Sequence, residues 1–242
     1  MKKVAIIGYG TNWSEAPFDD PEIEIWIQNI GEILKYKFPR FDRVFDIHRK
    51  KVILEEAKAD PQGLEFCKTW DGTIYTLESL EELPRALEFP LDELTKYFFP
   101  WAIQLGKHQW IDSYWTSSTE MMLALAIYDG YEEIGIYGVD MSDTPEYRDQ
   151  RKGCEYMLGV AHGRGIRIKK SSTTPILRTK FIYGYEDKQA DAFKANIEAQ
   201  KQFISQQIAE LNGKGTDAAF RRAHLEGALH AYTNLEVNWL DK

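Results

Sequence analysis

Along residues 1–185, apolar positions follow two periodicities, one typical of strands and one typical of helices. Residues 3–7 form a short β-branched run that stops at Gly8, as a buried parallel strand does. The same kind of pattern predicts further strands at 22–27, 44–48, 73–77, 86–89, 133–139 and 166–168. Helices are predicted at 54–70, 118–129 and 148–163, with a short helix and then a loop over 90–116. Strands that alternate with helices indicate βαβ units. We therefore predict an α/β fold with an open, mostly parallel Rossmann-like sheet and helices on both faces.

The C-terminal part of the chain has a different pattern. Apolar residues recur at helical spacing from about Lys188 to Leu211, and the segment 212–215 interrupts them. A second helix is predicted from there to about Trp239. The chain therefore divides into a Rossmann-like nucleotide-binding domain, 1–185, and a C-terminal helical hairpin, 186–242. We expect the hairpin to pack across the sheet or to form a homo-oligomer contact.

Composition and charge exclude several classes of protein. The net charge of −8 argues against a dedicated nucleic-acid coat, because phosphate contacts need clustered Lys and Arg. No apolar run approaches the roughly 18 residues of a membrane span, and no signal peptide is evident. The two cysteines show no Cys-x-x-Cys spacing, as in a reduced, cytoplasmic protein.

Candidate binding residues follow the first two predicted strands. Gly8 and Gly10 lie two residues apart after the first strand, where glycines let backbone amides approach a phosphate or a nucleoside. The third glycine of a dinucleotide fingerprint is missing. Asn29 follows the second strand, and its amide suits either a base or sugar contact or a cap on the turn before Gly31.

Candidate catalytic residues follow two other strands. In open α/β sheets, ligands bind outside the carboxyl ends of the strands. His48 ends the third strand and is a candidate general base, because its usual pKa lies near neutrality. Asp140 follows the strand 133–139 and is a second candidate base, or a ligand of a divalent metal together with Asp143.

Hydroxyl and cationic residues begin two of the helices. Ser117 and Ser118 precede the helix 118–129, where a hydroxyl caps the first turn and free amides can bind an anion. Arg148 and Arg151 begin the helix 148–163, where the macrodipole disfavours cations. Phosphate binding, or an ion pair with Asp140 or Glu146, would explain them. Residues 97–115 are rich in aromatic side chains, and we expect them to cover the site and exclude water.

The string from Ser118 to Asp140 resembles the nucleotide-binding region of bacterial sialyltransferases with a single modified Rossmann domain. It is also similar to a related domain family that includes an archaeal pterin pyrophosphokinase. The shared features are Ser-Ser before the helix, Ala-Ile-x-x-Gly-Tyr-x-Glu-Ile at its end, and Gly-Val-Asp on the next strand. Gly8-x-Gly10 and the segment 26–29 fit the same pattern, and the resemblance covers about residues 3–170. Compact proteins of this kind are common in tailed-phage genomes.

The resemblance implies that Asn29 and Ser118 contact the nucleotide and that the Gly8–Gly10 loop lies beside the phosphate. Sialyl transfer in the family uses a histidine base just before the helix that begins here near Arg148, and this chain has arginine at that position. The family's asparagine in the first glycine loop falls on Tyr9, with Asn12 close by. The base would therefore have to be His48, Asp140 or Asp143.

Three functions follow from the resemblance together with these residues. The first is a glycosyltransferase-like enzyme that needs no cofactor, binds a nucleotide-sugar and transfers the sugar to a saccharide, a small molecule or a modified DNA base. Asp140 or His48 would be its base, and Arg148 or Arg151 would neutralise the phosphate. The second is a pyrophosphate or phosphoryl transferase with Mg²⁺ on Asp140 and Asp143. The third is a non-catalytic nucleotide-binding protein.

Overall fold

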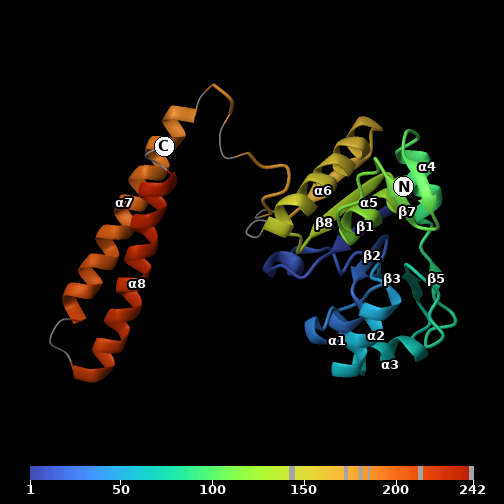
Figure 1. Cartoon of the computed structure of the whole chain (residues 1–242), viewed down its shortest axis with the longest axis horizontal. Helices are drawn as coiled ribbons and strands as arrows, with labels where there is room; N and C mark the ends of the chain where they lie inside the picture. The colour runs from blue at the N-terminus through green and yellow to red at the C-terminus, as the bar shows by residue number, and fades with distance from the viewer. Residues whose placement is uncertain (142–144, 172–173, 180–181, 185, 212–214, 240–242) are drawn as a thin grey trace. The chain divides into compact units, whose positions relative to one another are not determined.

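The computed structural model describes residues 1–141, 145–171, 174–179, 182–184, 186–211 and 215–239 (Figure 1). The chain forms two compact units, Met1–Arg178 and Thr179–Lys242. Each unit is described by itself. The first contains the sheet and the candidate site, and the second contains two long helices.

The first unit is built on a parallel sheet of seven strands in the order β5-β4-β3-β2-β1-β8-β9. These strands are β1 (Lys3–Ile7), β2 (Ile23–Gln28), β3 (Arg43–Asp46), β4 (Thr73–Thr76), β5 (Leu87–Glu88), β8 (Glu133–Tyr137) and β9 (Arg167–Lys170). The chain moves outward from β1 to β5 and then returns to the other side of β1 with β8 and β9. The direction of strand order therefore reverses between β1 and β8, where α/β sheets open a crevice for ligands.

Helices cover both faces of this sheet, as predicted (Figure 1). Side chains alternate along β1, so that Val4 and Ile6 face one layer and Ala5 and Ile7 face the other. The first layer contains α4 (Leu91–Phe98), α5 (Ser118–Tyr128) and α6 (Pro145–Gly163). The second contains α1 (Ile33–Tyr36), α2 (Lys50–Ala59) and α3 (Gln62–Thr69), with the 3-10 turns η1 (Thr11–Glu15) and η2 (Ile30–Glu32). The α/β fold class is thereby confirmed.

Helix α5 is apolar almost all round because it contacts β1 and β3 as well as the neighbouring helices α4 and α6. Its residues from Met122 to Ile127 are buried. A helix enclosed in this way has a fixed position, so its N-terminus is held rigidly near the carboxyl end of the sheet.

Two local predictions were wrong. The helix predicted at 54–70 is two helices, α2 and α3, because Pro61 disfavours helical backbone at Asp60, which is extended. The loop predicted up to residue 116 contains an antiparallel hairpin of β6 (Ile103–Gly106) and β7 (Gln109–Ile111). Apolar residues of this hairpin are exposed, so it lacks the one-sided burial that makes a strand visible in a sequence.

The second unit consists of α7 (Glu186–Leu211) and α8 (Gly215–Trp239), which pack against each other (Figure 1). The predicted helical hairpin is present, and its role in packing or in oligomer formation stays a prediction. Among the described residues, no helix is both long enough and apolar enough to cross a bilayer.

Candidate functional site

A cavity of about 500 Å³ lies at the carboxyl ends of β1, β2 and β8, beside the N-terminus of α5. We call it the strand-end pocket. Its described lining comes from the ends of β1, β2, β3, β8 and α1, from the start of α5, and from α6. These residues are Tyr9, Gly10, Gln28, Asn29, Tyr36, His48, Ser117, Ser118, Thr119, Gly138, Val139, Asp140, Met141, Tyr147 and Gln150. Six of the residues predicted from the sequence therefore meet in one cavity: Gly10, Asn29, His48, Ser117, Ser118 and Asp140.

The loops after β1 and β8 are tied together at the floor of this region. The Gly8 and Gly10 amides donate to the carbonyls of Tyr137 and Gly138 at 2.8 and 2.7 Å, and the Gly138 amide donates to Asn12 Oδ1 at 2.7 Å. A Cβ at residue 8 would lie 2.4 Å from the Gly138 carbonyl oxygen, so only glycine fits. Gly8 and Asn12 therefore build the loops, whereas Gly10 itself lines the pocket.

Asn29 both shapes a turn and faces the pocket. Its backbone has a positive φ of 62°, and its Oδ1 accepts the Gly31 amide at 2.9 Å. Its carbonyl accepts the hydroxyl of Tyr9, a residue whose burial raises its pKa. The predicted turn cap is thus present, and the amide nitrogen Nδ2 is the group left to donate to a ligand. The neighbouring Gln28 also lines the pocket, and its Oε1 lies 3.4 Å from Thr119 Oγ1.

The first turn of α5 presents backbone amides to the pocket. Ser117 is the N-cap, and its hydroxyl accepts the amide of Glu120 at 3.2 Å. Ser118 and Thr119, the next two residues, line the pocket. Because the first amides of a helix have no acceptor within the helix, this end of α5 suits an anion such as a phosphate.

Glu120 fixes the segment that leads into α5. Its Oε2 accepts both the amide and the hydroxyl of Thr116 at 2.7 Å. Its Oε1 is buried without a hydrogen-bond partner. Burial raises the pKa of this carboxyl to about 7. This residue was not predicted from the sequence, although Ser-x-x-Glu before an apolar helix is a known capping pattern.

His48 is oriented by a buried carboxylate. Its Nδ1 lies 2.7 Å from Asp46 Oδ1, and Asp46 is only 1% exposed. The other carboxylate oxygen accepts the Ile30 amide at 3.0 Å. A carboxylate only accepts, so His48 donates through Nδ1 and Nε2 remains for a ligand. The hydrogen bond to Asp46 raises the pKa of His48.

Asp46 was not predicted from the sequence either. The signal was the Asp-x-His spacing at a strand end, because residues two apart on an extended chain point to the same side. We call these two residues the His48–Asp46 pair.

Asp140 lies in the pocket wall and is exposed. It is the one carboxylate among the described lining residues. Asp143, its proposed partner in metal binding, lies outside the described residues. Within the described part of the chain, no cluster of three or more His, Cys, Asp or Glu side chains could hold a metal ion.

The two arginines of α6 do not line the pocket. Arg148 is exposed. Arg151 pairs with Glu155 at 2.8 Å and donates to the carbonyls of Pro175 and Arg178. Arg151 thus forms an ion pair with Glu155, whereas the predicted ion-pair partners were Asp140 and Glu146. The same helix contributes Tyr147 and Gln150 to the pocket. Residues 97–115 contribute nothing to the described lining, so the expectation that they cover this pocket was wrong.

No protein-family model matches the chain, and no curated protein matches it. Among solved structures it is similar to the sialyltransferase CstII from Campylobacter jejuni in complex with cytidine-5'-monophosphate. That likeness has a TM-score of 0.44 at 17% identity, over 76% of this chain and 92% of that one. A structure of CstII with a trisaccharide acceptor and CMP gives the same four values.

The monofunctional α-2,3-sialyltransferase Cst-I from Campylobacter jejuni gives a TM-score of 0.45 at 15% identity, over 72% of this chain and 77% of that one. Similarity at this level assigns no reaction to the chain. The reaction has to come from the residues that line the strand-end pocket.

Proposed function

We propose that this protein is a glycosyltransferase-like enzyme that binds a nucleotide-sugar in the strand-end pocket and transfers the sugar to a hydroxyl acceptor. One observation carries the proposal. A single cavity brings together the N-terminus of α5, the amide side chains of Gln28 and Asn29, and a histidine held by a buried aspartate. These groups suit a phosphate, a nucleoside and an acceptor hydroxyl respectively.

The donor would be held by neutral groups. The described lining contains no Lys or Arg side chain, so stabilisation of the phosphate falls to the α5 amides. A helix N-terminus carries the equivalent of about half a positive charge. A donor with one phosphate charge, such as a CMP-sugar, therefore fits this pocket better than a UDP- or GDP-sugar with two. Tyr9, Tyr36 and Tyr147 also line the pocket and offer rings to a base.

The His48–Asp46 pair would supply the base. The acceptor oxygen attacks the anomeric carbon, and the bond between that carbon and the phosphate oxygen breaks. The bonding electrons leave with the phosphate, and the acceptor's proton moves to Nε2 of His48. Asp46 keeps Nδ1 protonated and stabilises the imidazolium that forms. Asp140 is the second candidate base, but no described residue orients it as Asp46 orients His48.

Thermal shift against a panel of free nucleotides and CMP-, UDP- and GDP-sugars tests the donor site. A ligand that binds the folded chain raises its melting temperature by mass action, and we expect the largest shift from a CMP-sugar. N29A should reduce that shift. The matched control is Q62A, which changes an exposed amide side chain on α3 outside the described lining of the pocket and should leave the shift unchanged. A flat response across the panel would remove the proposal's support.

Turnover distinguishes the alternatives. Loss of activity in a chelator would favour the Mg²⁺-dependent phosphoryl transferase with Asp140 and Asp143. Tight nucleotide binding without sugar transfer to saccharide, small-molecule or modified-DNA acceptors would favour the non-catalytic binding protein. We expect transfer that persists in the chelator.

A further inference from the structure

A second cavity, of about 670 Å³, lies on the first unit and shares no described lining residue with the strand-end pocket. It is formed by Phe99, Trp101, Asp112, Ser113, Tyr114 and Tyr156, and we call it the aromatic groove. Trp101 is 59% exposed, Tyr114 38% and Tyr156 36%, so their rings are presented to solvent. Large exposed aromatic rings around one hollow are unusual and mark interaction sites.

The rings of the groove are held in place. Trp101 Nε1 donates to the carbonyl of Asp112 at 2.9 Å. Phe99, which is buried, lies between the others: its ring stacks on Tyr156 at 5.8 Å and meets Trp101 edge-on at the same distance. Tyr114 packs edge-on against Tyr156 at 5.6 Å. A ligand would therefore meet rings that need little further ordering.

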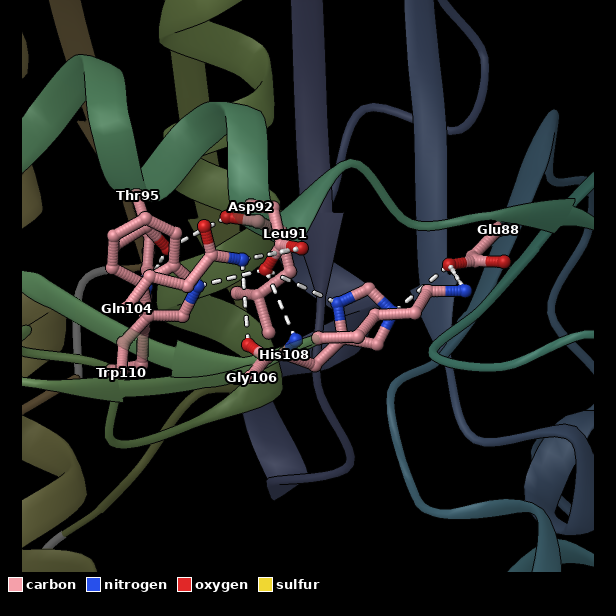
Figure 2. A network of polar contacts seen from close by, with 10 residues as sticks. Glu88, Leu91, Asp92, Thr95, Gln104, Gly106, His108 and Trp110 are labelled. Carbon is pink, nitrogen blue, oxygen red and sulfur yellow. Dashed lines mark hydrogen bonds and ion pairs between the residues drawn. The ribbon is translucent and has the colours of Figure 1, made fainter.

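The β6–β7 hairpin fixes the two sides of the groove relative to each other. Trp101 lies just before β6 and Asp112 just after β7. Figure 2 shows the polar network that holds this hairpin against α4 and β5. We call it the hairpin network, and its side chains are Glu88, Asp92, Gln104, His108 and Trp110.

Asp92 is the centre of this network. Its Oδ1 accepts the His108 amide at 3.1 Å and Trp110 Nε1 at 2.7 Å, and its Oδ2 lies 3.2 Å from Gln104 Nε2 (Figure 2). His108 Nε2 lies 2.9 Å from Glu88. The hairpin is thus anchored by several hydrogen bonds, although its apolar side chains are exposed.

We propose that the aromatic groove binds a saccharide chain and is the acceptor subsite of the enzyme. A pyranose ring has a face of C–H groups that packs on an aromatic ring, and hydroxyls around its edge that need polar partners. Trp101, Tyr114 and Tyr156 provide the rings, and the Asp112 carboxylate and Ser113 hydroxyl provide polar groups in the same hollow. A protein partner would also use the aliphatic residues of the hairpin, but none of these lines the groove.

The position of the groove supports this role, which rests on the proposed function. The groove and the strand-end pocket are built on the same two segments. Tyr114 is three residues from the pocket residue Ser117, and Tyr156 follows Gln150 on α6 by about 9 Å of helix. Thr116, between the two sites, also contacts the Gln150 carbonyl at 3.2 Å. A saccharide of a few residues could therefore extend from the groove toward the strand-end pocket.

Saccharide binding is tested directly with maltotetraose, cellotetraose, chitotetraose and N-acetyllactosamine, by saturation-transfer NMR and tryptophan fluorescence. We expect at least one to bind, and W101A to weaken it by at least tenfold. D112N should weaken it less, and W101F should be intermediate because it keeps a ring but loses the bond to Asp112. The matched control is L105A, which changes a 65% exposed hairpin residue outside the groove and should bind normally.

The outcomes separate this proposal from the proposed function. Nucleotide thermal shifts should be the same in W101A and the wild-type chain, since Trp101 does not line the strand-end pocket. If a saccharide binds but no nucleotide or nucleotide-sugar raises the melting temperature, the groove remains a saccharide site and the donor site in the strand-end pocket is contradicted. Absence of binding to all four saccharides, or full binding in W101A and D112N, would overturn the groove proposal. So would self-association of the chain that W101A abolishes, because a second copy would then occupy the groove.

Discussion

The strand-end pocket and the β6–β7 hairpin each contain a histidine beside carboxylates, and the two histidines are used in opposite ways. His48 has one ring nitrogen on Asp46 and lies in the wall of a cavity, with 41% of its side chain exposed. His108 has one nitrogen 2.9 Å from Glu88 and the other 3.4 Å from Asp92, with 14% exposed. A histidine between two carboxylates joins elements, whereas one with a single partner keeps a nitrogen for chemistry.

Unsatisfied buried atoms do not separate the two regions. In the hairpin network, both carboxylate oxygens of Asp92 accept protein donors, yet Nδ1 of His108 is buried without a hydrogen-bond partner. Beside the pocket, Oε1 of Glu120 is buried without a hydrogen-bond partner as well. The contrast therefore rests on His48 itself, which lines a cavity and has one carboxylate partner.

The largest expected effect is on catalysis. H48Q should lower kcat/KM for sugar transfer by about 10²–10⁴-fold, because a positioned general base contributes that much. Unfolding should change little, since His48 lies in a cavity wall. H108Q is the matched control and should show the reverse, with a less stable hairpin, a raised KM for a saccharide acceptor and a nearly normal kcat. If H108Q lost as much activity as H48Q, the contrast between the two histidines would be wrong.

The pH dependence of transfer identifies the base more sharply. Neutral His48 is the active form, so kcat/KM should fall as the pH drops through its pKa. The hydrogen bond to Asp46 raises this pKa, so the midpoint should lie above 6.5. D46N removes the negative charge, and we expect the midpoint to move to lower pH with a lower plateau. A midpoint that D46N leaves unchanged would instead assign the base to a group other than His48.

The second effect concerns stability beside the pocket. Glu120 has a pKa of about 7 against an ordinary 4.5, so the folded chain binds this proton more tightly than the unfolded chain. The free energy of unfolding should therefore fall as the pH rises from 4.5 to 7, by about 3 kcal/mol. E120Q cannot ionise and should lack this loss, which urea unfolding between pH 4 and 8.5 measures.

The control for this experiment is E65Q, which changes a 61% exposed carboxylate on α3. Its profile should run parallel to that of the wild-type chain. If the free energy of unfolding of E120Q also fell with pH as it does in the wild-type chain, Glu120 would not be the residue that binds the proton more tightly in the folded state.

Sequence patterns predicted the pocket well because it depends on topology. Asn29, His48 and Asp140 were each placed after a parallel strand, and parallel strands end at the same edge of a sheet. Ser117 could be placed because helix caps follow local rules. Each of these inferences needs only a strand or helix boundary, which apolar periodicity supplies.

What the sequence could not supply depends on long-range contacts or on exposed apolar residues. Arg151 looked like a phosphate ligand, but its guanidinium bonds to carbonyls more than 20 residues away. The β6–β7 hairpin was predicted as a loop over the site because its segment is rich in aromatic residues, and its strands were missed because their exposed apolar positions show no buried face. The hairpin is held in place by Asp92 and Glu88. In a sequence, these two residues cannot be told apart from the charged residues that commonly lie at solvent-exposed ends of helices and strands.

The smallest expected effect is local and tests the hairpin itself. D92N keeps the shape of Asp92 but removes the charge that accepts the His108 amide and Trp110 Nε1. Because these groups are partly exposed, we expect a loss of about 1–2 kcal/mol. Amide hydrogen exchange should quicken in β6 and β7 while β1 and β8 stay protected. The control is D71N, which changes a 96% exposed aspartate and should alter exchange in neither region.

Since the hairpin positions Trp101 and Asp112, saccharide binding should weaken in D92N while nucleotide binding does not. Equal exchange in D92N and wild-type hairpins would show that contacts other than this network hold the groove together.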